Sequence, residues 1–163
     1  MGTPERPARA LRAEFAGRTA TPYLDEVASA DHELGRLFDE LRACGLFEEL
    51  FVLVLGDHGE AFGEHGESEH GLLCYEETLR IPLLARWPDG ARAGTRSQEL
   101  VSAVDVAPTL AEALGLEAQD DCDGLSFFAR ELPPERGLYF ESYYGYLSRG
   151  WSPIAGWLDE RGK

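Results

Sequence analysis

The most constraining feature of this sequence is an unbroken apolar run that ends in a glycine-flanked polar motif. The run extends from Leu50 to Leu55 and stops at Gly56. An apolar run of this length predicts a strand buried on both faces of a parallel sheet. Asp57 and His58 follow at once, so we expect them at the carboxyl end of the strand, where open α/β sheets bind ligands. A carboxylate and an imidazole between glycines suit a metal ion or an anion site.

Most of the histidines lie in the segment that follows this strand. His58, His65 and His70 are each followed by glycine, and they alternate with acidic residues at Glu60, Glu64, Glu67 and Glu69. Imidazole and carboxylate groups are common ligands of divalent metal ions. The alternative is a solvated acidic loop, but a position directly after a buried strand favours a binding site.

The composition excludes some classes of function. With 15 basic and 30 acidic residues the net charge is −15, which argues against nucleic acid as a partner. Any anion site must therefore be made locally positive by a metal ion or an arginine. The length suggests one globular domain, and the sequence shows neither a secretory signal nor a membrane-length apolar run. The compartment is left open, and the unpaired spacing of Cys44, Cys74 and Cys122 predicts free thiols.

Hydrophobic spacing predicts an α/β chain after an irregular lead-in over residues 1–20. A helix is expected over 21–45, because Thr21 and Pro22 form a start signal and apolar residues recur every three or four positions. Asp31 lies on this stripe and is expected as a buried, hydrogen-bonded carboxylate rather than a ligand. The other expected elements are a short helix within 72–80, strands over 81–87, 99–104 and 137–142, and a helix over 106–114 capped by Asp105.

Several segments, taken in order, resemble a known family. They are Gly56–Glu60, Phe62–Gly66, Tyr75–Glu77, Arg80–Leu83, Val104–Leu110 and Asp123–Ser126, with weaker pieces at Phe140–Ser142 and Gly150–Ser152. Together they resemble the carboxyl-terminal part of the sulfatase catalytic domain, in the alkaline-phosphatase-like superfamily. The resemblance implies a partial alkaline-phosphatase-like α/β sandwich with a mostly parallel sheet, extending over residues 21–163.

The resemblance also implies a chemistry, the hydrolysis of small-molecule or glycan sulfate esters at a divalent metal ion. Asp57 and His58 match the pair of metal ligands that follow the family's central strand. Calcium is the ion that the family favours, although a histidine ligand suits manganese or zinc better. His70 stands where many sulfatases have a lysine that contacts the sulfate group, and we expect it to be a catalytic residue that binds the anion, protonates the leaving group or touches the metal. His65 matches a loop position without an assigned role.

Two other parts of the family's active site are not found in this sequence. Sulfatases carry a Cys-or-Ser-x-Pro-x-Arg segment, whose first residue becomes the formylglycine nucleophile, and an early pair of aspartates that completes the metal site. We therefore expect an incomplete chain that is inactive alone and whose partner is the missing amino-terminal half. The alternatives are a phosphate or phosphonate ester hydrolase of the same superfamily, a chain that cannot fold alone, and a noncatalytic metal-binding remnant with Asp57, His58, His65 and His70 as ligands.

Overall fold

The structure is a computed structural model that describes residues 21–88, 90–117, 121–128, 132–133, 135–159 and 161–162. The described residues divide into two compact units, one formed by those within 21–50 and 88–91 and the other by those within 51–87 and 92–162. The two units are described separately. The expected lead-in over residues 1–20 lies outside the described residues.

The first unit contains the predicted amphipathic helix, α2 (Pro22–Ala43). Its start is as expected, because the Thr21 hydroxyl accepts a hydrogen bond from the Leu24 backbone N–H and proline occupies the first turn. The chain then turns into the 3₁₀ helix η1 (Phe47–Glu49), whose Phe47 ring lies 5.3 Å from the ring of Phe38. The prediction that Asp31 is buried is wrong, since this carboxylate is exposed on the helix surface.

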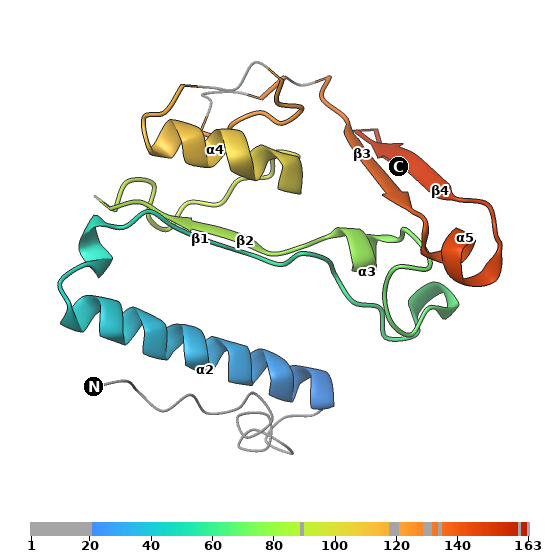
Figure 1. The fold of residues 1–163 in the computed structure, drawn as a ribbon, viewed down its shortest axis with the longest axis horizontal. Helices are drawn as coiled ribbons and strands as arrows, with labels where there is room; N and C mark the ends of the chain where they lie inside the picture. The colour runs from blue at the N-terminus through green and yellow to red at the C-terminus, as the bar shows by residue number, and fades with distance from the viewer. Residues whose placement is uncertain are drawn as a thin grey trace. The chain divides into compact units, whose positions relative to one another are not determined.

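The second unit begins with the predicted central strand, β1 (Val52–Leu55), and its partner β2 (Leu83–Arg86). They form an antiparallel pair in which Val52 lies opposite Arg86 and Leu55 opposite Leu83. Figure 1 shows the two strands side by side. Residues 56–82 contain only one short helix of the α type, α3 (Glu76–Leu79). Parallel pairing would require a crossover along the whole strand. This connection stays at the carboxyl end of β1, so β2 runs back in the opposite direction.

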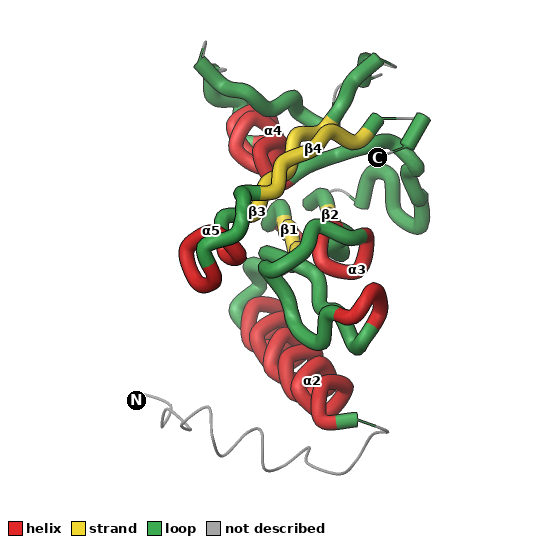
Figure 2. Tube along the Cα trace, turned by 90° about the vertical axis from the view of Figure 1, so that its right-hand side faces the viewer, coloured by secondary structure: helices red, strands yellow, loops and turns green. Residues whose placement is uncertain are grey.

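The sheet therefore differs from the expected mostly parallel one. Both ladders among the described residues are antiparallel, and both strand pairs appear in yellow in Figure 2. The side chains of Val52, Leu53 and Val54 are partly exposed rather than buried, because β2 is the one strand paired with β1 in the described part of the chain. The architecture is nevertheless mixed helix and strand, part of an α/β domain as predicted.

A buried aspartate organises the segment where a third strand was expected. Instead of a strand over 99–104, the chain forms the 3₁₀ helix η3 (Ala103–Asp105) followed by α4 (Val106–Ala113). The Asp105 carboxylate accepts a hydrogen bond from the Ser102 N–H at 2.7 Å, which closes a capping box and turns the backbone out of an extended conformation. Asp105 thus precedes α4 as predicted, but its side chain caps η3 instead.

The same aspartate connects distant parts of the second unit. It is fully buried and accepts hydrogen bonds from the Leu125 N–H at 2.8 Å and from the Arg136 guanidinium at 2.5 Å. One turn along α4, the buried Thr109 hydroxyl accepts a hydrogen bond from the Phe127 N–H at 3.1 Å. We call Asp105, Thr109 and Arg136 the polar hub of this unit, because they anchor the 125–127 segment to α4.

The described chain ends in a hairpin of which only half was predicted. Strand β3 (Leu138–Ser142) was expected, whereas α5 (Tyr144–Arg149) and β4 (Ile154–Leu158) were not. The two strands pair antiparallel, with Phe140 opposite Gly156. A Cβ atom at Gly156 would lie 2.3 Å from the Phe140 ring, so the absence of a side chain lets this ring cross the neighbouring strand.

Candidate functional site

The turn after β1 is held tightly and exposes its polar side chains. The Gly56 N–H donates to the Pro82 carbonyl at 3.2 Å, and the Gly59 N–H donates to the Thr78 carbonyl at 2.9 Å. A Cβ atom at Gly59 would lie 2.0 Å from the Glu77 carbonyl oxygen, so only glycine allows the backbone this close to α3. The turn leaves the Asp57 side chain 92% exposed and the His58 side chain 46% exposed.

Asp57 and His58 provide two potential metal-ligand atoms that lie close together. The Asp57 Oδ1 atom accepts a hydrogen bond from the His58 N–H at 3.1 Å, and its Oδ2 atom lies 3.8 Å from His58 Nε2. His58 Nδ1 lies 2.9 Å from the Gly59 carbonyl oxygen. Because a carbonyl can only accept, Nδ1 carries the proton of the neutral ring and Nε2 keeps its lone pair. Two ligands of one divalent ion lie ~3–4 Å apart, so these two atoms fit a shared ion.

His70 joins this pair through its ring. The rings of His58 and His70 are stacked, with centroids 3.9 Å apart and an interplanar angle of 30°. His70 Nδ1 lies 3.2 Å from both carboxylate oxygens of Glu60. Asp57, His58 and His70 also line one cavity of about 370 Å³, together with Tyr139 and Glu141 of β3. The structure thus brings together the three residues that the sequence singled out, although their roles stay predictions.

His65 lies in a different contact. Its Nδ1 atom is 2.5 Å from a carboxylate oxygen of Glu77, and its ring stacks on Tyr75 with centroids 3.9 Å apart. The backbone of His65 is left-handed, with φ of 54°, which is uncommon for a residue other than glycine. The structure therefore does not bring His65 to the histidine pair formed by His58 and His70.

Glu67 belongs to the framework of this loop rather than to its surface. It is only 5% exposed, and its carboxylate accepts hydrogen bonds from the N–H groups of Leu72 and Leu73 at 2.8 and 3.1 Å. The Ser142 hydroxyl donates to the Gly71 carbonyl and fixes the same segment against β3. Nothing in the residue spacing separated Glu67 from the exposed glutamates around it, because partners that follow it in an irregular loop leave no periodic signal.

Two residues of β3 were missed as neighbours of the site. The Tyr139 hydroxyl donates to a Glu141 carboxylate oxygen at 2.6 Å, and this hydrogen bond to the carboxylate raises the pKa of Tyr139. Both side chains lie on the exposed face of the strand, as the alternation of burial along β3 shows. The alternation along this strand could have predicted that Tyr139 and Glu141 share one face, but nothing in the sequence indicated that β3 would border the cavity.

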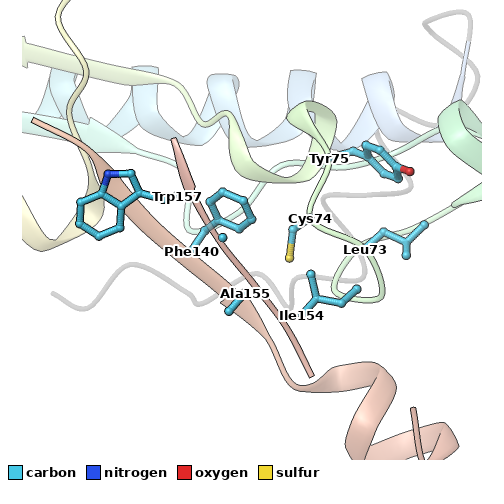
Figure 3. Close-up of a pocket in the computed structure, with 8 residues that line it drawn as sticks. Leu73, Cys74, Tyr75, Phe140, Ile154, Ala155 and Trp157 are labelled. Carbon is cyan, nitrogen blue, oxygen red and sulfur yellow. The ribbon is translucent and has the colours of Figure 1, made fainter. Parts of the chain in front are cut away.

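A second cavity adjoins the first and is apolar. It has a volume of about 450 Å³ and shares Leu73, Cys74 and Phe140 with the cavity beside the histidines. Figure 3 shows Phe140, Ile154 and Trp157 of the β3–β4 hairpin on one side and Cys74 and Tyr75 on the other. No charged side chain lines it, so this space suits apolar rather than ionic groups.

The histidine and carboxylate groups do not make a complete metal cage. Within the described residues, no three side chains of His, Cys, Asp or Glu gather closely enough to hold a metal ion. The four-ligand set of the noncatalytic alternative is therefore not assembled here, since His65 lies with Glu77 instead. None of the helices described is both long and apolar enough to span a membrane.

Comparison with known proteins identifies the family. Residues 3–116 match the Sulfatase family model. The N-acetylglucosamine-6-O-sulfatase of Bacteroides thetaiotaomicron is 35% identical over 104 residues, which are 64% of this chain and 18% of that protein. The steryl-sulfatase of Rattus norvegicus is 32% identical over 165 residues, covering 86% of this chain and 28% of that protein. The chain thus spans less than a third of the length of these relatives.

Solved structures agree with this assignment. The chain superposes with a TM-score of 0.67 and 31% identity on a protein solved in complex with its substrate, D-glucosamine-2-N,6-O-disulfate, over 75% of this chain and 26% of that one. The phosphonate monoester hydrolase of Agrobacterium radiobacter gives a TM-score of 0.71 at 23% identity, over 86% of this chain and 31% of that one, which is a likeness in fold alone. The match of the family model over most of the chain shows that this protein belongs to the sulfatase family.

Proposed function

We propose that this chain supplies a metal-binding pair and a leaving-group histidine to the active site of a sulfate ester hydrolase. The observation that carries the proposal is the convergence of Asp57, His58 and His70 on one cavity at the end of β1. Membership of the sulfatase family supports the same reading. The substrate class is a small-molecule or glycan sulfate ester, and an amino-sugar sulfate is supported by the ligand of the structural neighbour.

Asp57 and His58 would hold the divalent ion through Oδ2 and Nε2. The donor set fits, because these two atoms lie 3.8 Å apart on exposed side chains and Nε2 keeps its lone pair. Calcium is the first candidate for the bound ion, because the family resemblance favours it. Manganese and zinc are the alternatives, since they accept an imidazole ligand more readily. When bound, such an ion polarises the ester oxygens and offsets negative charge in the transition state. Its other ligands would be water or groups outside the described residues.

His70 would act on the departing alcohol. Hydrolysis breaks the bond between sulfur and the bridging oxygen, and this oxygen takes up a proton as the alcohol leaves. His70 Nδ1 contacts Glu60, so Nε2 is the nitrogen at the other side of the ring, and the protonated imidazolium form, which carries a hydrogen on both nitrogens, would deliver that proton from Nε2. The nucleophile that attacks sulfur must come from elsewhere, because no Cys-or-Ser-x-Pro-x-Arg segment occurs in these 163 residues.

The test is sulfate release by the full polypeptide that the gene encodes. With 4-nitrophenyl sulfate and N-acetylglucosamine 6-sulfate as substrates, His70→Ala should lower kcat by roughly 10²–10⁴-fold, the usual contribution of a general acid. His32→Ala on the exposed surface of α2 is the matched control and should leave kcat unchanged. Faster release of phosphate or phosphonate from the corresponding esters would favour the superfamily alternative, and metal binding without hydrolysis of any ester would favour a noncatalytic role.

The 163-residue chain itself gives a second arm of this test. We expect it to release no sulfate from either ester, because the nucleophile is not encoded in it. Turnover by this chain, removed by His70→Ala, would mean that another group attacks the sulfur atom and would overturn that part of the proposal.

A further inference from the structure

We propose that Glu60 is a positioning residue, which fixes the ring nitrogen that His70 presents to the substrate. The inference rests on the proposed role of His70. Both Glu60 carboxylate oxygens lie 3.2 Å from His70 Nδ1. An ionised carboxylate only accepts hydrogen bonds, so Nδ1 carries a proton in both the neutral and the charged ring, and Nε2 is the nitrogen that takes up the proton in the charged form and would hand it to the departing alcohol.

The backbone of the loop places these two residues opposite each other. The Ala61 N–H donates to the Glu69 carbonyl at 3.1 Å, and the Gly63 N–H donates to the Glu67 carbonyl at 2.8 Å. These bonds pair the outgoing and returning parts of the loop in a hairpin-like manner. Continuing the same pairing by one step puts Glu60 across from His70, so their contact follows from the backbone pairing.

Two contacts then fix the His70 ring. The Glu60 carboxylate is 24% exposed, which limits its exchange of partners with water, and it holds the Nδ1 side of the ring. The His58 ring stacks on the face of His70 with centroids 3.9 Å apart. A carboxylate that holds the distal nitrogen of a functional histidine sets both its tautomer and its orientation.

The neighbouring histidine reaches the same tautomer by another route. His58 Nδ1 lies 2.9 Å from the Gly59 carbonyl oxygen, a backbone group that no substitution removes. His70 depends on a side chain, so its tautomer can be changed without touching the Asp57–His58 pair. His58 is therefore an internal reference for any change at His70.

The direct test is the tautomer of both histidines in the 163-residue chain labelled with nitrogen-15. At alkaline pH, where imidazole is neutral, long-range proton–nitrogen correlations distinguish a protonated Nδ1 from a protonated Nε2. We expect both His58 and His70 to carry the proton on Nδ1. In Glu60→Ala the His70 signals should shift towards the protonated Nε2 form while those of His58 stay unchanged, and Glu60→Gln, whose amide oxygen still accepts, should restore the original signals in part.

Glu69→Gln is the matched control for the loss of one negative charge, because Glu69 is an exposed residue of the same loop. Its backbone carbonyl accepts the hydrogen bond from the Ala61 N–H, and the substitution keeps this contact with the loop. This variant should leave the His70 tautomer unchanged. A wild-type His70 protonated on Nε2, or an unchanged His70 spectrum in a folded Glu60→Ala chain, would overturn the inference.

Kinetics on the full polypeptide separate this inference from the proposed function. Glu60→Ala should lower kcat by roughly 10–100-fold with little change in KM, as expected when the support of a functional histidine is removed. Glu60→Gln should recover much of that loss. An unchanged kcat in an active sulfatase would refute the positioning role alone, whereas the tautomer result stands even if no sulfate ester is hydrolysed.

Discussion

Asp57 and Asp105 are the same residue type in opposite surroundings. Asp105 is fully buried and accepts hydrogen bonds from two backbone N–H groups and from the Arg136 guanidinium. The Asp57 side chain is 92% exposed, and one of its oxygens accepts a hydrogen bond from the next residue in the chain. The first carboxylate has its acceptor capacity used by the fold, while the second keeps acceptor capacity for a ligand.

The comparison shows how to distinguish structural from functional carboxylates in this chain. A buried carboxylate survives only when hydrogen bonds replace its water, and such partners tie it to one conformation. An exposed carboxylate on a tightly held turn costs little to maintain and stays available. By this criterion Glu67 belongs with Asp105, although it lies in the same loop as the histidines.

The largest expected effect is the loss of the polar hub. Asp105→Ala should destabilise the chain by roughly 3–5 kcal/mol, because it leaves the Arg136 guanidinium, only 10% exposed, without its charged partner. Urea denaturation followed by circular dichroism measures the change. A loss below about 1 kcal/mol would mean that the hub does not hold the second unit together.

An intermediate effect is expected inside the histidine loop. Glu67→Ala should cost roughly 1–3 kcal/mol, since it leaves the N–H groups of Leu72 and Leu73 without their acceptor. Glu69→Ala, an exposed neighbour, should stay within about 0.5 kcal/mol of the wild type. Equal stability of the two variants in the same denaturation experiment would place Glu67 with the exposed glutamates instead.

A smaller effect on folding is expected at the proposed metal site. Asp57→Ala should change the free energy of unfolding of the metal-free chain by less than about 0.5 kcal/mol, because its side chain is almost fully exposed. Thermal melting in the presence of a chelator tests this. A loss comparable to that of Asp105→Ala would assign Asp57 to the framework and remove the contrast.

The smallest effect concerns the ion pair between Asp159 and Arg161. The side chain and backbone of Arg161 donate hydrogen bonds to Asp159 and lower the pKa of its carboxyl below the usual 3.8. A lowered pKa in the folded state means that any stabilisation is present above the unfolded pKa and fades as the pH falls through the folded one. A carboxyl titration by nuclear magnetic resonance should give a midpoint below the ordinary aspartate value, and Arg161→Ala should raise it towards that value without restoring it fully, because the backbone N–H groups of residues 161 and 162 remain.

Local signals in the sequence predicted much of the fold. The Thr21–Pro22 start of α2 and the apolar run of β1 each depend on neighbouring residues, and each was found as expected. Strand pairing was not predictable in the same way, because an apolar run does not reveal the direction of its neighbour. The prediction of a strand over 99–104 was wrong, because the Asp105 carboxylate accepts a hydrogen bond from the Ser102 N–H. It also accepts hydrogen bonds from Leu125 and Arg136, which lie 20 and 31 positions further along the chain.

The candidate site shows the same division. Asp57, His58 and His70 stood out by residue type and by position after a strand, and the structure brings them to one cavity. Their distinction from His65 and Glu67 depended on partners such as Glu77 and the Leu72 N–H, which lie across an irregular loop. Such contacts have no sequence period, so only the folded structure separates the residues that line the cavity from those that hold the loop in place.

The most direct test of this account is calorimetric titration of the metal-stripped chain with calcium, manganese and zinc. We predict binding of about one equivalent of ion to the folded wild-type chain, lost in the double variant Asp57→Ala, His58→Ala and retained in His65→Ala. Binding that survives the double variant, or that requires His65, would contradict the assignment of Asp57 and His58 as the ligand pair. Failure of the folded chain to bind any of the three ions would contradict a site that Asp57 and His58 form without further protein ligands.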